Sequence, residues 1–448
     1  MPRSRYGLKP PLSALRIVRH GRLALALSLA GVAATASPVA SQEPRPVTLD
    51  EAVALAVERS PSAIAARGSV RVARADALEA KGAWLPALNL GMAYANSSNE
   101  RFDQASGQLV SESYTAQARG SYELFAGGRR IADIRAALAR LHAAEASERG
   151  EQFATALETT RIFYAAAAAE ELLGAAQQRL ERARRQLDFA QTRLLVGTAT
   201  RSDVLRAELE TEEAELAVVD AESELSTSRL LLARQIGSES PVRPAAGVLP
   251  ELVPELPPLD ELLALAESSA PAALAAREDL AAAEAEKRAS QTVYLPSLVA
   301  SGGYDWFSFE WPPDERSWTF RLTASLPLFD GFRREAAVSR AEAARRTAEA
   351  IARDALLGVR VSVEDAARQV QTSGRRIDIA RRARELAQED LRVIEERYQI
   401  GAATILDLQA SQVALADAEA AWIRSRQALG VAVASLEAEI GQTVVEGS

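Results

Sequence analysis

The sequence predicts a membrane α+β fold in which a duplicated unit combines pairs of β-strands with very long coiled-coil helices. Three observations point to it. Landmarks of the first half recur in the second half, each half contains a long tract without proline, and each half carries segments that alternate between apolar and polar residues. Internal repetition, helical periodicity and strand alternation are separate signals, and here all three agree.

The composition excludes several classes of function. The chain has 448 residues, no cysteine, only two histidines and a formal net charge of −9. Disulfide scaffolds, thiol nucleophiles and thiolate or multi-histidine zinc sites are therefore ruled out, and the acidic charge argues against a nucleic-acid partner. No nucleophile–base pair stands out, so we predict that the protein is not an enzyme and has no metal and no cofactor.

Residues 1–36 are predicted to be a secretory signal peptide. Basic residues come first, residues 23–36 are uncharged and mostly apolar, and Ala34-Thr35-Ala36 is a plausible cleavage signal. Cleavage after Ala40 and an uncleaved anchor helix are the alternatives. No later apolar run is long enough to predict a transmembrane helix.

The chain is predicted to be a tandem repeat, with repeat 1 at 49–237, repeat 2 at 259–441 and a tail at 442–448. The offset between matching landmarks is first 210 residues and then 204, as these pairs show: Trp84-Leu85-Pro86 with Tyr294-Leu295-Pro296, Leu124-Phe125-Ala126-Gly127 with Leu328-Phe329-Asp330-Gly331, and Val196-Gly197 with Ile400-Gly401. Between the repeats, 238–258 contains six prolines, which predicts an extended linker and excludes a helix or inner strand.

Long helices are predicted for 129–196 and 333–400, each about 100 Å long at ~1.5 Å per residue. Leucines recur every seven residues along the first of them, as in a coiled coil (Leu173, Leu180, Leu187, Leu194). The returning helix at 202–236 is too short to cover its long neighbour. Two shorter helices stacked end to end must therefore flank each long one, with short helices at 49–59 and 259–269 near the joint.

Strand pairs are predicted for 86–125 and 296–329, where apolar and polar residues alternate with a period of two. Aromatic residues gather toward one end of these strands and predict the girdle of a membrane β-barrel (Tyr114, Trp306, Phe307, Phe309, Trp311, Trp318). The edge of a soluble β-sandwich is the alternative, because aromatic residues also favour strands there.

Four strands cannot close a membrane barrel, and open strand edges are not viable in lipid. The barrel must therefore be shared between chains, and two copies would supply 8 strands and three copies 12.

With these features, the chain resembles the TolC-like outer membrane efflux protein family from about Leu49 to Gly441. The resemblance rests on the repeated Leu-Pro before the first strand of each pair, Leu328-Phe329-Asp330-Gly331 after the second, and two glycine turns. It implies a homotrimer with a 12-stranded β-barrel in the outer-membrane lipid and an α-helical tunnel in the periplasm. The implied function is a passive exit duct for tripartite efflux or type I secretion, docked to a periplasmic adaptor (membrane fusion) protein and an inner-membrane pump or transporter.

The resemblance also implies where the duct is gated. The turns between long and returning helices would form the closed entrance and the adaptor-docking surface (Val196, Gly197, Thr198; Ile400, Gly401, Ala402). Asp203 and Asp407 match acidic tip positions, and Tyr398 matches a tyrosine of the tip network. One hypothesis is that Asp407 from three chains forms a carboxylate ring favouring cations. The alternative is helix capping, because Thr200 with Asp203 and Thr404 with Asp407 fit capping boxes.

Acidic residues crowd 208–224, and four arginines of the preceding helix lie at matching height (Arg179, Arg182, Arg184, Arg185). Ion pairing between the two helices is the preferred interpretation, and a negative tunnel wall is the alternative.

A competing function is a soluble periplasmic coiled-coil adaptor or structural protein, since adaptors also carry long helical hairpins. Two hairpins, each joined to an amphipathic strand pair, favour the duct instead. The predicted location is the cell outer membrane, with most of the chain in the periplasm.

Overall fold

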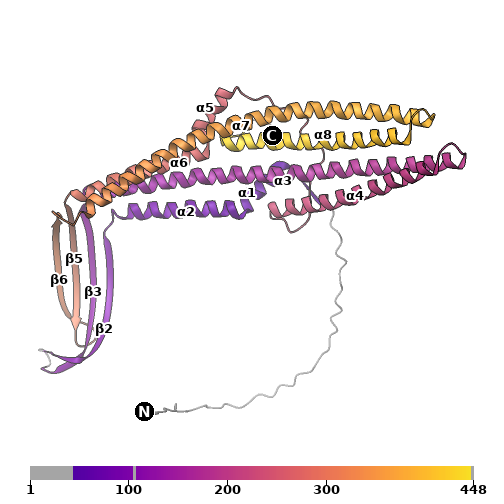
Figure 1. Ribbon diagram of the computed structural model, residues 1–448. Coiled ribbons are helices and arrows are strands. Elements are labelled where there is room, and N and C mark those ends of the chain that lie inside the picture. The colour runs from indigo at the N-terminus through magenta and orange to yellow at the C-terminus, as the bar shows by residue number, and fades with distance from the viewer. Residues whose placement is uncertain (1–43, 104–106, 445–448) are drawn as a thin grey trace, which may run out of the picture. The chain divides into compact units, whose positions relative to one another are not determined.

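The computed structural model describes residues 44–103 and 107–444 (Figure 1). The predicted signal peptide at 1–36, the alternative cleavage after Ala40 and the last residues of the tail lie outside the described residues.

Eight α-helices are present in the described part of the chain, four from each repeat. Pro61 and Pro271 each occupy the first turn of a helix, where the missing N–H costs nothing. The helices of repeat 1 are α1 (Leu49–Arg59), α2 (Pro61–Gly82), α3 (Arg129–Leu195) and α4 (Arg201–Gln235); those of repeat 2 are α5 (Leu259–Ser269), α6 (Pro271–Gln291, continued by a 3₁₀ turn at Thr292–Tyr294), α7 (Arg333–Gln399) and α8 (Ile405–Ile440).

The four long strands form one antiparallel sheet in the order β2-β3-β5-β6. Each repeat contributes one hairpin, and the two hairpins meet where β3 pairs with β5. Both outer strands, β2 and β6, leave one side without a strand partner within the described chain. The bounds are β2 (Ala87–Phe102), β3 (Leu109–Phe125), β5 (Ser297–Ser308) and β6 (Glu315–Ser325).

The linker is less featureless than its prolines predict, because β4 (Val242–Pro244) pairs in parallel with β1 (Arg45–Val47). Val47 and Val242 are buried together with Phe163 of α3. Pro244 donates no hydrogen bond, and the ladder continues instead through Ala245 N, which donates to the Val47 carbonyl at 2.9 Å. Proline is tolerated at the edge of a sheet, and in a two-stranded ladder both strands are edges. Burial of Val47 and Val242 offsets the backbone N–H donor that Pro244 lacks.

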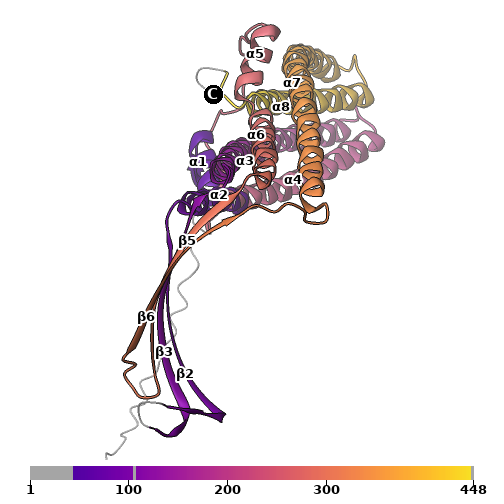
Figure 2. The ribbon, with the colours of Figure 1, turned by 90° about the vertical axis from the view of Figure 1, so that its left-hand side faces the viewer.

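The helices form a single curved layer (Figures 1 and 2). On the side of the helix turns, neighbouring contacts give the order α7-α8-α3-α4, and toward the strands they give α7-α6-α3-α2. The short helices lie where the flanking helices meet, with α1 against α3 and α5 against α7. The layer therefore ends at α7 on one edge and at α2 and α4 on the other.

Small residues allow close approach of the long helices. The buried face of α3 is largely alanine, and the core between α7 and α8 is built from Val363, Val370 and Ile377 against Leu429 and Leu436. Alanine combines high helix propensity with little volume, which suits closely packed helices. Within the described ranges, no helix is sufficiently long and apolar to traverse a lipid bilayer.

Candidate functional site

The two helical hairpins turn through the same backbone design. Gly197 and Gly401 both have φ 77°, a left-handed conformation that glycine adopts without strain. The next residue in each turn caps the preceding helix: Thr198 N donates to the Arg193 carbonyl at 2.8 Å, and Ala402 N to the Arg397 carbonyl at 2.7 Å. The sequence therefore reverses direction at equivalent places in both repeats.

Both predicted capping boxes are present at the start of the returning helices. The Thr404 hydroxyl accepts from Asp407 N at 3.2 Å, and Asp407 Oδ2 accepts from Thr404 N at 2.8 Å; Thr200 and Asp203 do the same at 3.2 and 2.8 Å. Donation from the Thr404 backbone and hydroxyl lowers the pKa of Asp407 below its ordinary 3.8. Asp407 is therefore an exposed, ionised carboxylate that also starts α8.

Arg193 joins the two tips. Its Nη1 donates to the Tyr398 carbonyl at 3.0 Å and its Nη2 to the Thr198 carbonyl at 3.2 Å. The guanidinium also lies 5.3 Å from the ring centre of Tyr398 and 5.7 Å from that of Phe189. Tyr398 is only 5% exposed, so the Arg193 guanidinium packs against a buried ring of the hydrophobic cluster at the tip.

The family resemblance assigned Tyr398 to the tip, but no role was predicted for Arg193. A signal was available, because Arg193 recurs as Arg397 in repeat 2, four residues before the glycine of its turn. Arg397 makes the equivalent bond within its own turn, from Nη2 to the Ala402 carbonyl at 3.3 Å.

The turns themselves expose apolar side chains. Val196 is 68% exposed and Ile400 80%, and Leu195 beside them is also exposed. Such exposed apolar groups at the end of a rigid hairpin are suited to a protein partner.

Aromatic residues cluster around the turn between β5 and β6 and on the strand positions beside it. The ring of Tyr114 on β3 is tilted against Tyr94 at 5.2 Å and meets Trp311 edge-on at 5.9 Å between ring centres, and Phe307 meets Phe309 edge-on at 5.1 Å. Trp306 pairs with Tyr304 at 4.6 Å, while Trp318 of β6 is exposed. The six residues predicted to form a girdle thus lie in the β5–β6 turn, on the half of β5 that adjoins it or beside that half, with Tyr114 opposite Ser308 and Trp318 opposite Tyr304.

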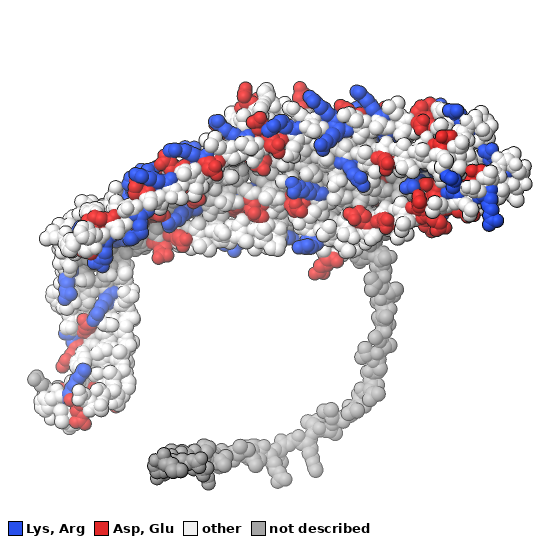
Figure 3. Space-filling view, viewed as in Figure 1, with Lys and Arg blue, Asp and Glu red and all other residues white. Residues whose placement is uncertain are grey.

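The predicted ion pairing between α3 and α4 is realised by Arg179, which binds Glu210 at 2.9 Å. Arg182 instead approaches Glu419 of α8 at 3.8 Å, and Arg184 approaches Glu181 on its own helix at 3.6 Å. The expectation for Arg182 was wrong because α3 is flanked by α8 as well as α4, and that for Arg184 was wrong because its partner Glu181 lies one turn away on α3 itself. On the face seen in Figure 3, positive and negative side chains are interspersed over the helices.

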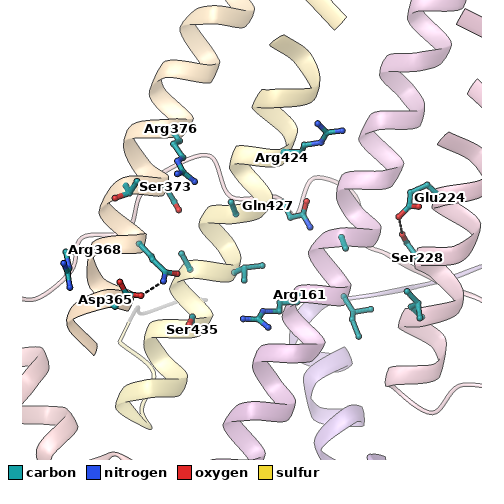
Figure 4. Close-up of a pocket in the computed structure, with 18 residues that line it drawn as sticks. Arg161, Glu224, Ser228, Asp365, Arg368, Ser373, Arg376, Arg424, Gln427 and Ser435 are labelled. Carbon is teal, nitrogen blue, oxygen red and sulfur yellow. Dashed lines mark hydrogen bonds between the residues drawn. The ribbon is translucent and has the colours of Figure 1, made fainter. Parts of the chain in front are cut away.

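A groove of about 800 Å³ crosses α3, α4, α7 and α8 (Figure 4). Its lining is mixed in charge and includes Glu224 and Asp365 together with four arginines (Arg161, Arg368, Arg376, Arg424). Within the described ranges, histidine and acidic side chains nowhere form a group of three able to hold a metal ion.

Comparisons with known proteins place this fold. The family model described as "Outer membrane efflux protein" matches residues 52–238 and 262–442, most of the chain. Two curated relatives are similar. Protein CyaE of Bordetella pertussis is 29% identical over 66% of this chain and 63% of its own length, and outer membrane protein OprJ of Pseudomonas aeruginosa is 26% identical over 75% and 70%.

A solved structure, described as a membrane protein from Pseudomonas aeruginosa, superposes with a TM-score of 0.76 and covers 88% of this chain and 93% of its own. At 24% identity this likeness shows the fold. The match to CyaE spans less than two thirds of that protein. The predicted TolC-like fold is confirmed, and so is the predicted family. The chain belongs to the outer membrane efflux protein family.

Proposed function

We propose that this protein is the outer-membrane exit duct of a tripartite efflux or type I secretion system, formed by three copies of the chain. Each copy contributes its four strands to a 12-stranded barrel and its helical layer to a tunnel in the periplasm. The duct is passive, and an inner-membrane pump or transporter supplies the energy.

The observation that carries this proposal is that the same layer is open along both edges. The sheet ends at β2 on one side and at β6 on the other. The helical layer ends at α7 on one side and at α2 and α4 on the other. Open strand edges are not tolerated in lipid. Two different edges of one chain joined head to tail generate a closed ring, and three copies give a barrel of the expected size.

The tips supply the entrance and the docking surface of the proposed duct. Exposed Val196, Gly197 and Thr198, with Ile400, Gly401 and Ala402, form the surface that a periplasmic adaptor contacts. The entrance is shaped by the buried ring of Tyr398 behind these turns. The capping residues beside the turns also contribute to it (Thr200, Asp203, Thr404, Asp407).

Cell fractionation followed by mass measurement in detergent tests the duct. We expect the mature protein in the outer-membrane fraction and, after extraction, at the mass of three chains. Recovery in the soluble periplasmic fraction without detergent, as for an adaptor, would overturn the proposal.

The carboxylate ring is tested by ion selectivity in planar bilayers. Asp407→Ala and Asp407→Asn should both reduce the preference for cations, because each removes three charges from the entrance. The asparagine variant keeps a side-chain oxygen that can accept from Thr404 N, whereas the alanine variant loses this half of the capping box, at a cost of about 1 kcal/mol. Comparing the two therefore separates charge from folding.

The selectivity of the wild-type channel should also be the same at pH 7 and pH 5, because the lowered pKa keeps Asp407 ionised at both. Unchanged selectivity in Asp407→Asn would show that Asp407 only caps the helix.

A further inference from the structure

We propose that the contact between repeat 1 and repeat 2 inside the chain is the template for the seam between copies, which fixes that seam residue by residue. This inference rests on the proposed ring. In it, repeat 2 of one copy packs against repeat 1 of the next copy, as repeat 1 packs against repeat 2 within the chain.

The repeat offsets describe the structure as well as the sequence. Ala87 pairs with Ser121 in the first hairpin, and Ser297 pairs with Ser325 in the second. Adding 210 to the first residue and 204 to the second converts one pair into the other. The long helices agree, since α3 and α7 begin at Arg129 and Arg333 and α4 and α8 at Arg201 and Ile405.

The same offsets convert the internal β3–β5 ladder into a ladder between copies. Ala118 pairs with Tyr304 inside the chain, so Leu322 of β6 should pair with Tyr94 of the neighbouring copy. In the same way Arg119 with Gly303 gives Thr323 with Ala93, and Gly120 with Gly302 gives Ala324 with Met92.

The chemistry of the two free edges supports this register independently. It sets Leu322 opposite Tyr94, Ala324 opposite Met92 and Leu326 opposite Leu90, so that the apolar faces of the two strands adjoin there. A slip of one residue would set these apolar side chains against polar ones, since successive side chains of a strand point to opposite faces.

A second contact lies on the helices. Inside the chain, Arg426 of α8 binds Glu171 of α3 at 2.7 Å. The equivalent positions are Glu222 of α4 and Arg375 of α7, so the two charges have exchanged places. Both side chains are exposed, and neither has an ion-pair partner among the described residues. The template makes them partners between copies.

A third contact lies where strands meet helices. Gly127, at φ 63°, packs so tightly on Leu295 that a Cβ there would lie 2.9 Å from the Cβ of that leucine. Its equivalent Gly331, at φ 70°, faces open space, and Leu85, the equivalent of Leu295, is 72% exposed. The seam brings Gly331 and Leu85 of adjacent copies together, so the three predicted contacts extend from the strands to the interior of α4 and α7.

Cysteine cross-linking tests the strand register without background, because the chain has no cysteine. The full-length double variant Ala93→Cys with Thr323→Cys, oxidised in isolated outer membranes, should give covalent dimers and trimers on a non-reducing gel. The matched control, Ala95→Cys with Thr323→Cys, displaces one thiol by two residues, beyond disulfide reach, and should cross-link several-fold less.

Charge reversal tests the helix contact. Arg375→Glu and Glu222→Arg should each place like charges together and lower the fraction of trimer in detergent. The double variant should restore it, whereas Arg424→Glu, on α8 within the layer, should have little effect. Trimers that cross-link equally in both cysteine pairs and show no rescue would overturn the seam while leaving the duct standing. A protein that is monomeric before any substitution would instead refute the proposed function.

Discussion

Replacing Arg426 with alanine should destabilise the folded protein by about 2–3 kcal/mol, because it leaves a partly buried carboxylate without its partner. The Arg426 side chain is 5% exposed and binds Glu171 at 2.7 Å. It also donates to the Leu249 carbonyl at 2.8 Å and lies 4.5 Å from the ring centre of Trp422. Arg426 thus ties the linker to α3 and α8.

The expected cost lies below that of a fully buried pair because the Glu171 side chain is still 32% exposed. The matched control is Arg424→Ala on the same helix, which removes an exposed arginine that has no ion-pair partner among the described residues. Chemical unfolding of the detergent-solubilised protein measures both. Equal stability of the two variants would contradict a role for Arg426 in holding the linker.

The same variant carries a pH signature. Burial raises the pKa of Glu171, and Arg426 opposes this effect. Removing Arg426 raises that pKa further, so the folded variant takes up a proton more readily than the unfolded chain. Its stability deficit should therefore shrink as the pH falls from 7 to 5, and adding Glu171→Gln should recover part of the deficit at pH 7. A deficit independent of pH would indicate lost packing alone.

Most of the helices and strands could be predicted from local sequence signals. The proline-free tracts and the glycine turns predicted the long helices to within a residue or two, because propensity and capping act over short distances. Alternation predicted the strand pairs for the same reason. The pairing of β1 with β4 was missed because it depends on burying Val47 and Val242 against Phe163, residues far apart in sequence.

The site shows the same division. Thr404 and Asp407 are three residues apart, so their capping box could be predicted from the sequence. Arg193 and Tyr398 are 205 residues apart in the sequence, and Arg182 pairs with α8 instead of α4. Both contacts are decided by the side-by-side order of the helices. That order follows from packing of the whole layer, and a heptad pattern in one helix does not reveal which helices will be its neighbours.

Close approach of α3 to α8 depends on Gly430, and Gly430→Ala should destabilise the protein by about 1–3 kcal/mol through overpacking. A Cβ at this position would clash with Cε2 of Tyr164, whose ring packs edge-on to Phe163 with centres 5.9 Å apart. The added methyl group must therefore push the ring away from Phe163 into the adjoining groove or separate the two helices.

Gly174→Ala is the matched control, since that glycine of α3 has no atom within 4 Å of the added Cβ. Helix propensity alone should make this control neutral or stabilising by up to about 1 kcal/mol, so the two substitutions are expected to have opposite signs. Combining Gly430→Ala with Tyr164→Ala should remove most of the extra cost, because the methyl group then fills space left by the ring. If Gly430→Ala behaved like Gly174→Ala in thermal unfolding, contact with Tyr164 would not set the spacing of α3 and α8. Because α3 and α8 are the neighbours that join the two hairpins of one chain, the same spacing sets the width of wall that each copy gives the proposed tunnel.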